Sequence, residues 1–303
     1  MTTVFLVNPA SANGSTGKRW PELAQLAARR GLAGEAVISE RPGQLADLAR
    51  RAADDGATLL VVVGGDGTVF EVANGIAGRE GVEIGVVPRG TGWDFARSHG
   101  IPRRTEDALS VAAGGRTKTI DVGRARFRAW DGSERSAYFA NAASVGMSGA
   151  IAARANATSK ALGGKVAYAW ATIAVFKRWR AAELAVQVGD ERLSGRMHDV
   201  IVANGHSLAG GMKVCPEARA DDGVFDVLAI GDLTKSDLML NMPKLYRGTH
   251  LPHPKAKLLR GATASVESTE PLPVQLDGEQ PGTTPVRFEV VPAALRVRVA
   301  EAP

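Results

Sequence analysis

The stretch from Val61 to Thr68, Val-Val-Val-Gly-Gly-Asp-Gly-Thr, constrains this chain more than any other part of its sequence. A short β-branched run predicts a buried strand, and the glycines after it let the backbone turn sharply and approach a ligand closely. Thr68 and Glu71 have the spacing of a capping box, which predicts a helix starting directly after the turn. A strand, a glycine loop and a helix N-terminus together favour phosphate binding over a plain turn. Asp66 inside the loop indicates that a cation accompanies the phosphate, as in a magnesium nucleotide.

The composition of the chain limits its size class, its cellular compartment and its partners. The 303 residues suffice for two domains or one large one, and a hydrophobic content of 45% supplies a core. The single cysteine, Cys215, excludes a disulfide framework, and the longest apolar stretch, Val166 to Phe176, is too short to span a bilayer. With a strand-like start instead of a basic leader, these features predict a cytoplasmic protein. The net charge of +5 favours anionic partners such as nucleotides or acidic membrane surfaces, without choosing between them.

The first half of the chain alternates between strand-like and helix-like segments. Strand-like runs cover residues 4–7, 35–39, 61–64 and 84–88, and each is followed by a loop and a predicted helix. This alternation predicts a doubly wound, mainly parallel sheet, in which the loops after the strands gather at one crevice. Asn8, Asp66 and Asp94 all follow strand ends, so we expect them to face that crevice together.

The pattern changes around Thr119–Gly123, where helices give way to short alternating segments with turns. These segments predict a mainly antiparallel β domain. We therefore expect a nucleotide-binding α/β domain over residues 1–123 and a β-rich domain over residues 124–292. A predicted helix from Gly163 to Arg180 is apolar in the middle and basic at its end, which favours a core-facing helix over a membrane-surface one.

Five segments of the chain stand out together: Asn8-Pro9, Gly64-Gly65-Asp66-Gly67-Thr68, Asn74-Gly75, the run from Pro88 to Ala96, and Leu276-Asp277-Gly278-Glu279. They resemble the catalytic domain of the diacylglycerol and sphingosine kinase family of lipid kinases, including its bacterial members. NAD kinases share the glycine–aspartate–glycine–threonine motif, and phosphofructokinases share it more loosely. The Pro-x-Gly-Thr-x-x-Asp-Phe-Ala pattern is much more specific to the lipid kinases. Trp93 is a departure, because the family usually has asparagine there.

The resemblance implies a fold and an activity. It implies an N-terminal α/β domain of the NAD kinase and diacylglycerol kinase type, to which residues 293–303 return, and a C-terminal antiparallel β-sandwich. It also implies an ATP- and Mg²⁺-dependent kinase that transfers the γ-phosphate to the hydroxyl of a diacylglycerol-like lipid, in phospholipid metabolism. The implied partners are a lipid substrate at the membrane surface and a nucleotide, with no nucleic acid. The resemblance further implies that the protein is cytoplasmic and peripherally associated with the membrane. It leaves open whether the protein forms a homodimer.

The same resemblance assigns roles to individual residues. The catalytic set is Asp66, Asp94, Asp121, Asp277 and Glu279, and we expect these five carboxylates to meet at one gap between the domains. The first three would hold Mg²⁺ mostly through water, and Asp277 or Glu279 would take the proton from the lipid hydroxyl, although the sequence does not separate those two roles. Nucleotide binding is assigned to Asn8, Pro9, Ser11, Lys18, Ser39, Gly64, Gly65, Asp66, Gly67, Thr68, Asn74, Gly90 and Thr91. A structural Mg²⁺ would be bound by the Asp222 carboxylate and the carbonyls of Arg219 and Val224.

Other functions are weaker interpretations of the same sequence. An NAD kinase is expected to carry an Asn-Glu pair where this chain has Gly-Thr-Gly-Trp-Asp-Phe-Ala, and an inactive lipid-binding homologue has no reason to keep five carboxylates. Gly205-His206-Ser207-Leu208-Ala209 is similar to a hydrolase nucleophile elbow but lacks its last glycine. His250 and His253 have metal-like spacing, but neighbouring prolines exclude a regular helix that would present both rings.

Overall fold

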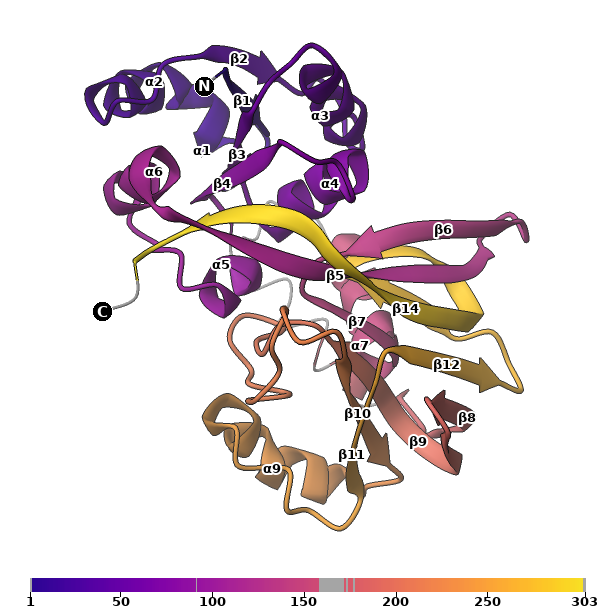
Figure 1. The fold of residues 1–303 in the computed structure, drawn as a ribbon. Helices are drawn as coiled ribbons and strands as arrows, with labels where there is room; N and C mark the ends of the chain where they lie inside the picture. Colours follow the sequence, from indigo (N-terminus) through magenta and orange to yellow (C-terminus); the bar gives the residue numbers. More distant parts are fainter. Residues whose placement is uncertain (1, 91, 158–171, 173, 177, 302–303) are drawn as a thin grey trace. The chain divides into compact units, whose positions relative to one another are not determined.

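A computed structural model divides the chain into two compact units (Figure 1). Unit 1 contains Met1–Val122 and Pro292–Pro303, and unit 2 contains Gly123–Val291. The structure describes residues 2–90, 92–157, 172, 174–176 and 178–301. Thr91, one of the predicted nucleotide-binding residues, and most of the predicted helix between Gly163 and Arg180 lie outside the described residues. No helix in the described ranges has the length and apolar content needed to cross a membrane.

Unit 1 is built from alternating strands and helices, as the sequence predicts. Its strands are β1 (Thr3–Val7), β2 (Glu35–Ile38), β3 (Leu59–Gly64), β4 (Glu83–Pro88) and the end of β14 (Glu279–Val299). Its helices are α1 (Ser15–Lys18), α2 (Trp20–Arg29), α3 (Leu45–Asp54), α4 (Asp66–Ile76), α5 (Asp94–Ser98) and α6 (Thr105–Gly114). The strands pair in the order β14-β4-β3-β1-β2, and every one of these pairings is parallel. The predicted doubly wound parallel sheet is confirmed.

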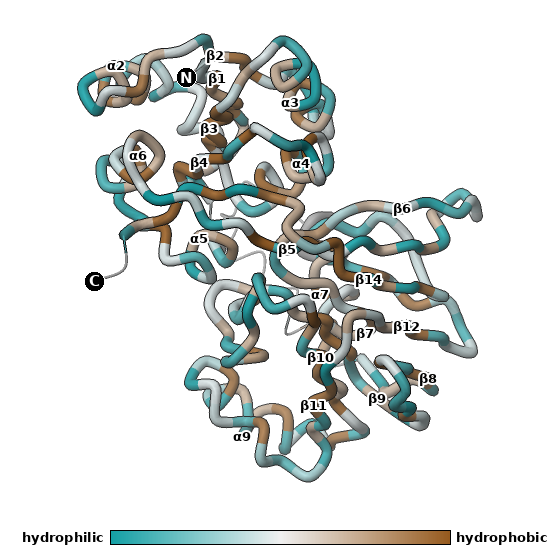
Figure 2. Tube along the Cα trace, in the orientation of Figure 1, coloured by the Kyte–Doolittle hydropathy of each residue, from teal (hydrophilic) through white to brown (hydrophobic). Residues whose placement is uncertain are grey.

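The core of unit 1 explains why its strands are continuous hydrophobic runs. Every residue of β1, β3 and β4 is buried, since helices cover the sheet, and the hydropathy trace is brown along β3 and β4 (Figure 2). Leu23 of α2 and Leu109 of α6 pack with Val61 and Val63 in one buried cluster. Gly75 lets α3 and α4 approach closely, because a Cβ atom there would lie 2.3 Å from the Ala46 carbonyl oxygen.

The predicted capping box at the start of α4 is wrong. Helix α4 begins at Asp66, three residues earlier than the box requires, and its N-cap Gly65 has no side chain to donate or accept. Thr68 is inside the helix and buried, with its hydroxyl close against Gly64, where a Cβ atom would lie 2.1 Å from Thr68 Oγ1. Glu71 Oε2 instead accepts a hydrogen bond of 2.9 Å from the Leu45 amide at the start of α3.

Unit 2 is mainly β structure, entered through β5 (Arg116–Ala129), which begins in unit 1. Its other strands are β6 (Glu134–Phe139), β7 (Ala142–Gly146), β8 (Ala182–Val188), β9 (Glu191–Ala203), β10 (Phe225–Gly231), β11 (Ala256–Gly261), β12 (Thr263–Ser268), β13 (Pro273–Leu276) and most of β14. Its described helices are α7 (Met147–Ala157) and α9 (Lys235–Arg247).

The strands of unit 2 pair in antiparallel fashion and close on themselves. β9 pairs with β7, β7 with β13, β13 with β14, β14 with β12, β12 with β8, and β8 again with β9. Along β8 the buried and exposed residues alternate, as expected for a strand with one face in the core. The predicted C-terminal antiparallel β domain of the sandwich type is confirmed by this topology.

Candidate active site

Three loops at the carboxyl ends of β1, β3 and β4 contact one another in unit 1. Asn8 Nδ2 donates to Thr68 Oγ1 at 3.1 Å, which joins the loop after β1 to the first turn of α4. Gly65 and Gly90 meet backbone to backbone, since a Cβ atom on Gly90 would lie 2.7 Å from the Gly65 Cα atom. Any side chain at position 90 would push these two loops apart. The glycines are therefore needed for the loops to gather at this edge of the sheet.

Asp66 and Asp94 are the two predicted catalytic carboxylates that the structure brings together. Both face Gly92, where a Cβ atom would lie 2.9 Å from Asp66 Oδ2 and 3.1 Å from Asp94 Oδ2. The other oxygens are engaged: Asp66 Oδ1 accepts from the Phe95 amide at 3.1 Å, and Asp94 Oδ1 pairs with Arg97 Nη1 at 2.6 Å. The two Oδ2 atoms thus flank one space that a side chain at position 92 would fill.

The pKa of Asp66 is raised at this site. Burial raises the pKa of Asp66 to about 6, and the negative charge of Asp94 adds to the rise. Hydrogen bonds from the amides of Phe95, Asp94 and Trp93 act in the opposite direction but do not outweigh these two causes. Two carboxylates in such a position repel each other, and a divalent cation between or beside them would remove the repulsion.

Arg89 is a candidate site residue that sequence reasoning missed. Its guanidinium donates from Nη2 to Ser15 Oγ at 3.1 Å and approaches Thr16 Oγ1 at 3.4 Å, so it links the loop after β4 to helix α1, which follows β1. Partial burial and the nearby charge of Arg19 lower its pKa. The available signal was its position, directly after a strand and directly before Gly90.

Trp93, the departure from the family pattern, is held in an unusual conformation. Its φ of 44° lies in the left-handed region, which asparagine adopts more readily than a bulky residue does. The guanidinium carbons of Arg97 and Arg103 lie 4.3 Å and 4.8 Å from the centre of its ring system. These two cation–π contacts offset part of the backbone strain.

The remaining predicted nucleotide-binding residues are spread over unit 1. Ser11 Oγ donates to the Asn8 carbonyl at 2.9 Å, and the buried Ser39 donates its amide to the Val7 carbonyl at 3.0 Å. Lys18 is exposed at the end of α1. Asn74 Nδ2 donates to the Phe70 carbonyl within α4 at 2.8 Å. Two others complete the set: Pro9, which packs against Gly17, and Gly67, which lies in the first turn of α4.

Asp121 has a structural contact within unit 1. Its Oδ1 accepts a hydrogen bond of 2.8 Å from the Ala293 amide, where the C-terminal stretch returns to the unit. The carboxylate is buried, so this bond satisfies part of its hydrogen-bonding capacity. Asp121 therefore helps to fix the returning strand, whatever role it has toward a nucleotide.

Asp277 lies in unit 2, in the turn between β13 and β14, with φ of 48°. Its Oδ2 accepts from the Ala140 amide at 2.7 Å, and its Oδ1 accepts from the amides of Asn141 at 3.0 Å and Ala142 at 2.8 Å. Three backbone donors hold this carboxylate in one orientation. Glu279, two residues later, is exposed. The expected meeting of all five carboxylates spans both units and stays a prediction.

The predicted structural Mg²⁺ site near Asp222 already contains a cation from the chain itself. Arg260 Nη2 pairs with Asp222 Oδ2 at 2.7 Å, and Arg260 Nε pairs with Asp226 Oδ1 at 3.2 Å. Asp222 Oδ1 accepts from the Val224 amide at 3.3 Å, and Arg219 Nε pairs with Asp221 at 3.3 Å. The guanidinium of Arg260 thus neutralises one oxygen of the Asp222 carboxylate, and Mg²⁺ binding by Asp222, Arg219 and Val224 stays a prediction.

The structure supports neither the nucleophile-elbow interpretation of Ser207 nor a metal site at His250 and His253. Ser207 lies 2.8 Å from His206 Nδ1 but is fully buried, so its hydroxyl is inaccessible to a substrate. His250 is also buried, with Nε2 at 3.0 Å from the Val214 carbonyl. Within the described part of the chain, no group of three or more His, Cys, Asp or Glu side chains could hold a metal.

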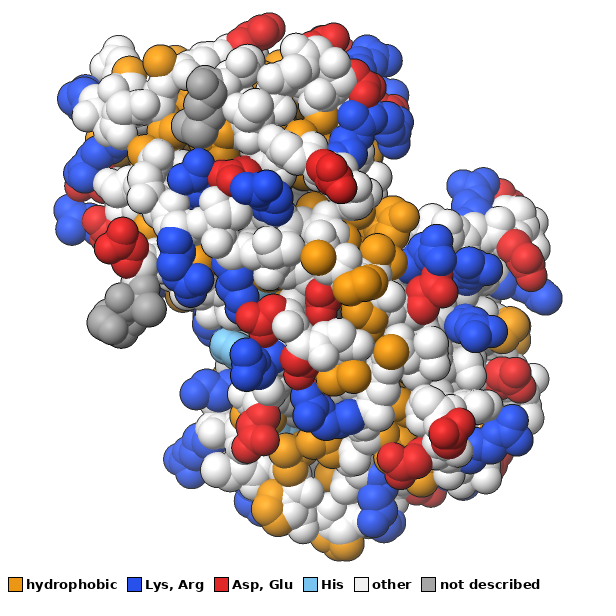
Figure 3. Space-filling view, viewed as in Figure 1, with side chains coloured by type: hydrophobic (Ala, Val, Ile, Leu, Met, Phe, Trp, Pro, Cys, Tyr) orange, Lys and Arg blue, Asp and Glu red, His pale blue; other side chains and the backbone are white. Residues whose placement is uncertain are grey.

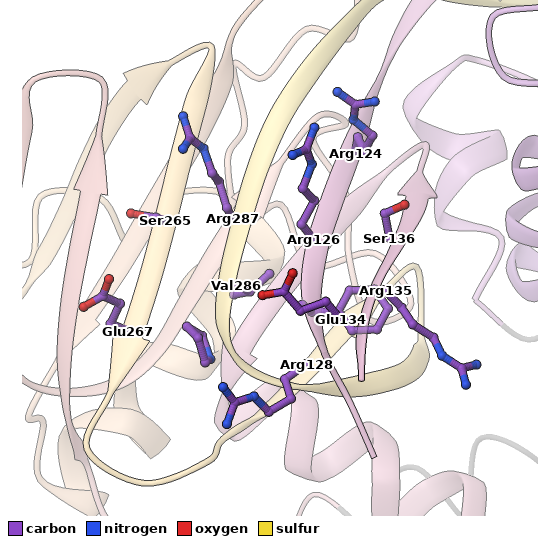
Figure 4. Close-up of a pocket in the computed structure, with 12 residues that line it drawn as sticks. Arg124, Arg126, Arg128, Glu134, Arg135, Ser136, Ser265, Glu267, Val286 and Arg287 are labelled. Carbon is purple, nitrogen blue, oxygen red and sulfur yellow. The ribbon is translucent and has the colours of Figure 1, made fainter. Parts of the chain in front are cut away.

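A cavity of about 680 Å³ in unit 2 is lined by none of the predicted site residues (Figure 4). It is formed by β5, β6, β12 and β14, and Arg124 and Arg126 on its β5 side share the carboxylate of Glu289. Five arginines line it: Arg124, Arg126, Arg128, Arg135 and Arg287. We refer to it below as the arginine cavity.

The parallel α/β unit, its three joined loops and the closed antiparallel unit define the kinase fold that diacylglycerol kinases and NAD kinases share. Residues 2–125 match the model of the diacylglycerol kinase catalytic domain, and residues 141–299 match that of the YegS C-terminal NAD kinase beta sandwich-like domain. The diacylglycerol kinase of Staphylococcus carnosus (strain TM300) is 27% identical over 285 residues, which cover 94% of this chain and 90% of that protein.

Solved structures agree on the fold. A diacylglycerol kinase from Bacillus anthracis str. Sterne superposes with a TM-score of 0.75 at 19% identity, covering 99% of this chain and 97% of that chain. Yeast NADH kinase in complex with NADH gives a TM-score of 0.52 at 12% identity, over 100% of this chain and 84% of that chain. The chain belongs to the bacterial diacylglycerol kinase-like family of lipid kinases.

Proposed function

We propose that the protein is an ATP- and Mg²⁺-dependent kinase that phosphorylates the hydroxyl of a diacylglycerol-like lipid. The observation that carries the proposal is the contact of three strand-end loops around the paired carboxylates of Asp66 and Asp94. Family membership supports a phosphotransferase, and the acceptor is the part that experiment must identify. The enzyme would work from the cytoplasmic surface of the membrane, where its acceptor lies.

The loops of unit 1 would bind the nucleotide. Helix α4 begins with Gly65 as its N-cap directly after β3, and helix N-termini favour phosphate. Asn8 is oriented toward this turn by its bond to Thr68. Arg89, fixed by Ser15, adds a positive charge at the same edge of the sheet.

Asp66 and Asp94 fit a magnesium ion bound through water and phosphate oxygens. Their Oδ2 atoms flank the same space, and the pKa of Asp66 is raised first by burial and then by the negative charge of Asp94, a repulsion that a cation would remove. Magnesium in kinases keeps several waters and uses few carboxylates, which suits a pair better than a cage. When bound, the ion would neutralise charge on the β- and γ-phosphates during transfer.

The transfer itself forms one bond and breaks another. The lipid hydroxyl oxygen attacks the γ-phosphorus, the bond to the oxygen bridging the β- and γ-phosphates breaks, and ADP leaves. The hydroxyl proton would pass to the carboxylate of Asp277 or Glu279. Asp277 is held by three amides, whereas Glu279 is exposed.

The direct test measures transfer of radiolabelled γ-phosphate from ATP to diacylglycerol, monoacylglycerol, phosphatidylglycerol and sphingoid bases. NAD is included as an acceptor because of the likeness to NADH kinase. We expect transfer to at least one lipid that depends on Mg²⁺. Phosphorylation of NAD without any lipid product would overturn the proposal, and nucleotide binding without turnover would favour an inactive lipid-binding homologue.

Asp66→Asn is the most informative variant, because asparagine keeps the shape and the acceptor oxygen for the Phe95 amide. We expect turnover to fall by about a hundredfold or more with the fold intact. Asp54→Asn, on the exposed end of α3, is the matched control and should retain the normal rate. Near-normal activity of Asp66→Asn would mean that the site is misplaced.

Asp277→Asn is less clean as a test of proton transfer. An amide NH₂ at that position would face one of the three backbone donors that now bind the carboxylate, which is expected to destabilise unit 2. Glu279→Gln avoids this problem because Glu279 is exposed. The turnover rate of each variant is measured together with its thermal unfolding curve. A lower rate without a lower unfolding temperature indicates a chemical role, and a fall in both indicates a structural one.

A further inference from the structure

Helix α9 of unit 2 presents an apolar and basic face to solvent. The described residues contain six exposed large hydrophobic side chains, and Met239, Leu240 and Tyr246 of α9 are three of them. Met239 is 67% exposed and Leu240 is 73% exposed, so both are almost entirely outside the core. Such a concentration on one short helix marks a contact surface better than scattered apolar residues would.

The same face is positively charged. Lys235, Lys244 and Arg247 are exposed on α9, and the exposed Lys213 is hydrogen-bonded through its amide to the Leu245 carbonyl at the end of the helix. The one acidic residue of α9, Asp237, lies in the first turn, where its carboxylate accepts from the Thr234 amide and hydroxyl as part of the capping box. Hydrophobic side chains and lysine or arginine appear together at this end of unit 2 (Figure 3).

The helix is firmly placed on unit 2 in spite of its exposed face. A complete capping box fixes its start at Thr234, and Gly248 in the left-handed conformation ends it. Leu245, on the opposite face, packs against the buried cluster that includes Cys215 and Leu228. The apolar face is therefore a fixed feature of the folded unit.

We propose that α9 binds to the surface of a bilayer that contains anionic phospholipid, with Met239 and Leu240 in the interfacial region and the three cations against lipid phosphates. Exposed apolar residues flanked by lysine and arginine are the composition of helices that lie in a membrane interface. Tyr246 adds an aromatic ring with a polar end, which suits the headgroup level. The proposal extends the proposed function, because an enzyme with a lipid acceptor must reach the membrane, yet it is tested without turnover.

The experiment measures co-sedimentation of the full chain with vesicles of phosphatidylcholine and phosphatidylglycerol in equal parts, and with pure phosphatidylcholine. We expect clear binding to the anionic vesicles and much weaker binding to the neutral ones. Met239→Ser/Leu240→Ser, which leaves the charge unchanged, should lower the partition coefficient about tenfold or more. Lys244→Gln/Arg247→Gln should lower it about fivefold for each cation removed.

The arginine cavity supplies the matched control. Arg128→Gln/Arg287→Gln removes the same charge from that other basic surface and should change binding less than about twofold, since exposed charges act over a short range. If this variant loses binding while the Met239→Ser/Leu240→Ser variant keeps it, the arginine cavity is the membrane-contacting surface and the proposal is wrong. Absence of binding by the unaltered chain to both kinds of vesicle would overturn it as well.

A second measurement reports insertion directly. Cys215 is the only cysteine of the chain and is buried, so Met239→Cys provides a selective labelling position on α9. An environment-sensitive fluorophore there should shift to shorter wavelength with anionic vesicles, whereas the same label at Ser133→Cys, on the exposed turn before β6, should not. Equal responses at both positions would contradict insertion of α9.

Transfer to a short-chain diacylglycerol in solution separates this proposal from the proposed function. The Met239→Ser/Leu240→Ser variant should phosphorylate that acceptor normally and lose rate only on vesicles. A chain that binds vesicles through α9 but phosphorylates no lipid would leave this inference standing and overturn the kinase proposal.

Discussion

At the scale of single residues, Gly92 shows how a position without a side chain can define a site. Its open space lies between Asp66 Oδ2 and Asp94 Oδ2, and its backbone is outside the left-handed region. A methyl group at this position is therefore compatible with the chain and specifically crowds the two carboxylates.

We predict that Gly92→Ala lowers Mg²⁺-dependent phosphoryl transfer about tenfold or more, because small displacements of positioning groups have large effects on rate. The free energy of unfolding should change by less than about 1 kcal/mol, as is usual away from the core. Gly114→Ala, at the end of α6 with nothing within 4 Å of the added Cβ atom, is the control. Equal rates for the two variants would contradict the assignment of the carboxylate pair.

Asp199 is a buried carboxyl group that no part of the proposed mechanism uses. Its Oδ2 accepts from the Ser148 amide at 3.0 Å and from the Ser148 hydroxyl. Burial raises its pKa to about 7, and the bonds from Ser148 only partly oppose the rise. The folded protein therefore holds a proton on Asp199 at pH values where the unfolded chain has lost it.

Stability should fall as the pH rises from about 4 to about 7, by on the order of 4 kcal/mol over the whole interval if Asp199 acts alone. The contribution is complete below the unfolded pKa and is lost as pH passes the folded pKa. Asp199→Asn should remove this slope between about pH 5 and pH 7, measured as the denaturant midpoint at each pH. An unchanged slope in the variant would assign the pH dependence to other groups.

At the scale of elements, the buried carboxylate of Glu83 helps to hold the returning end of β14 in unit 1. Glu83, at the start of β4, pairs with Arg296 Nη2 at 2.8 Å and Arg298 Nε at 2.5 Å, and accepts from the Thr117 hydroxyl at 2.9 Å. Burial by itself would raise the pKa of Glu83, but the Thr117 hydroxyl and the two guanidinium groups outweigh it and lower the pKa. Three separate elements are thus tied at one point.

Glu83→Gln should destabilise unit 1 by roughly 2 to 4 kcal/mol near neutral pH, because it leaves two arginines without their buried partner. The lowered pKa means that the native contribution is present above the unfolded pKa of Glu83 and is lost as the pH falls through the folded one. The difference in the free energy of unfolding between the native chain and the variant, measured with urea, should therefore become smaller at acidic pH. A difference that is independent of pH would contradict the ionic character of this contact.

The sequence predicted most of the elements but misplaced the start of α4. Uninterrupted β-branched runs such as Val61–Val63 identified the buried strands because helices cover such strands on both faces. The capping box at Thr68 failed because α4 already begins at Asp66, and the Thr68 hydroxyl instead accepts a hydrogen bond from Asn8, sixty residues away. A local pattern cannot reveal a competing partner that only the fold supplies.

At the scale of the whole molecule, unit 1 is discontinuous in sequence. Its last strand comes from the end of the chain and pairs in parallel with β4 through Arg296 and Val297. Leu295, Val297 and Val299 are buried there. The first 122 residues therefore do not contain the complete core of the unit.

A chain that ends at Val291 should fail to fold unit 1. Loss of three buried aliphatic side chains costs about 5 kcal/mol or more, which is comparable to the whole stability of a domain. Circular dichroism and limited proteolysis should show an unfolded or aggregated N-terminal part, whereas a chain that ends at Glu301 behaves normally. A stable, protease-resistant unit 1 in the shorter chain would contradict this prediction.

The sequence by itself determined the succession of strands and helices, the glycine loop and the family, because these depend on short periodic patterns and local turns. Only the tertiary structure showed that Asp66 and Asp94 face the same space, that Arg89 binds helix α1, and that Arg260 binds Asp222. It also turned α9 outward with Met239 and Leu240 exposed. The physical reason is that each of these features depends on contacts between residues distant in the chain, which local patterns do not encode.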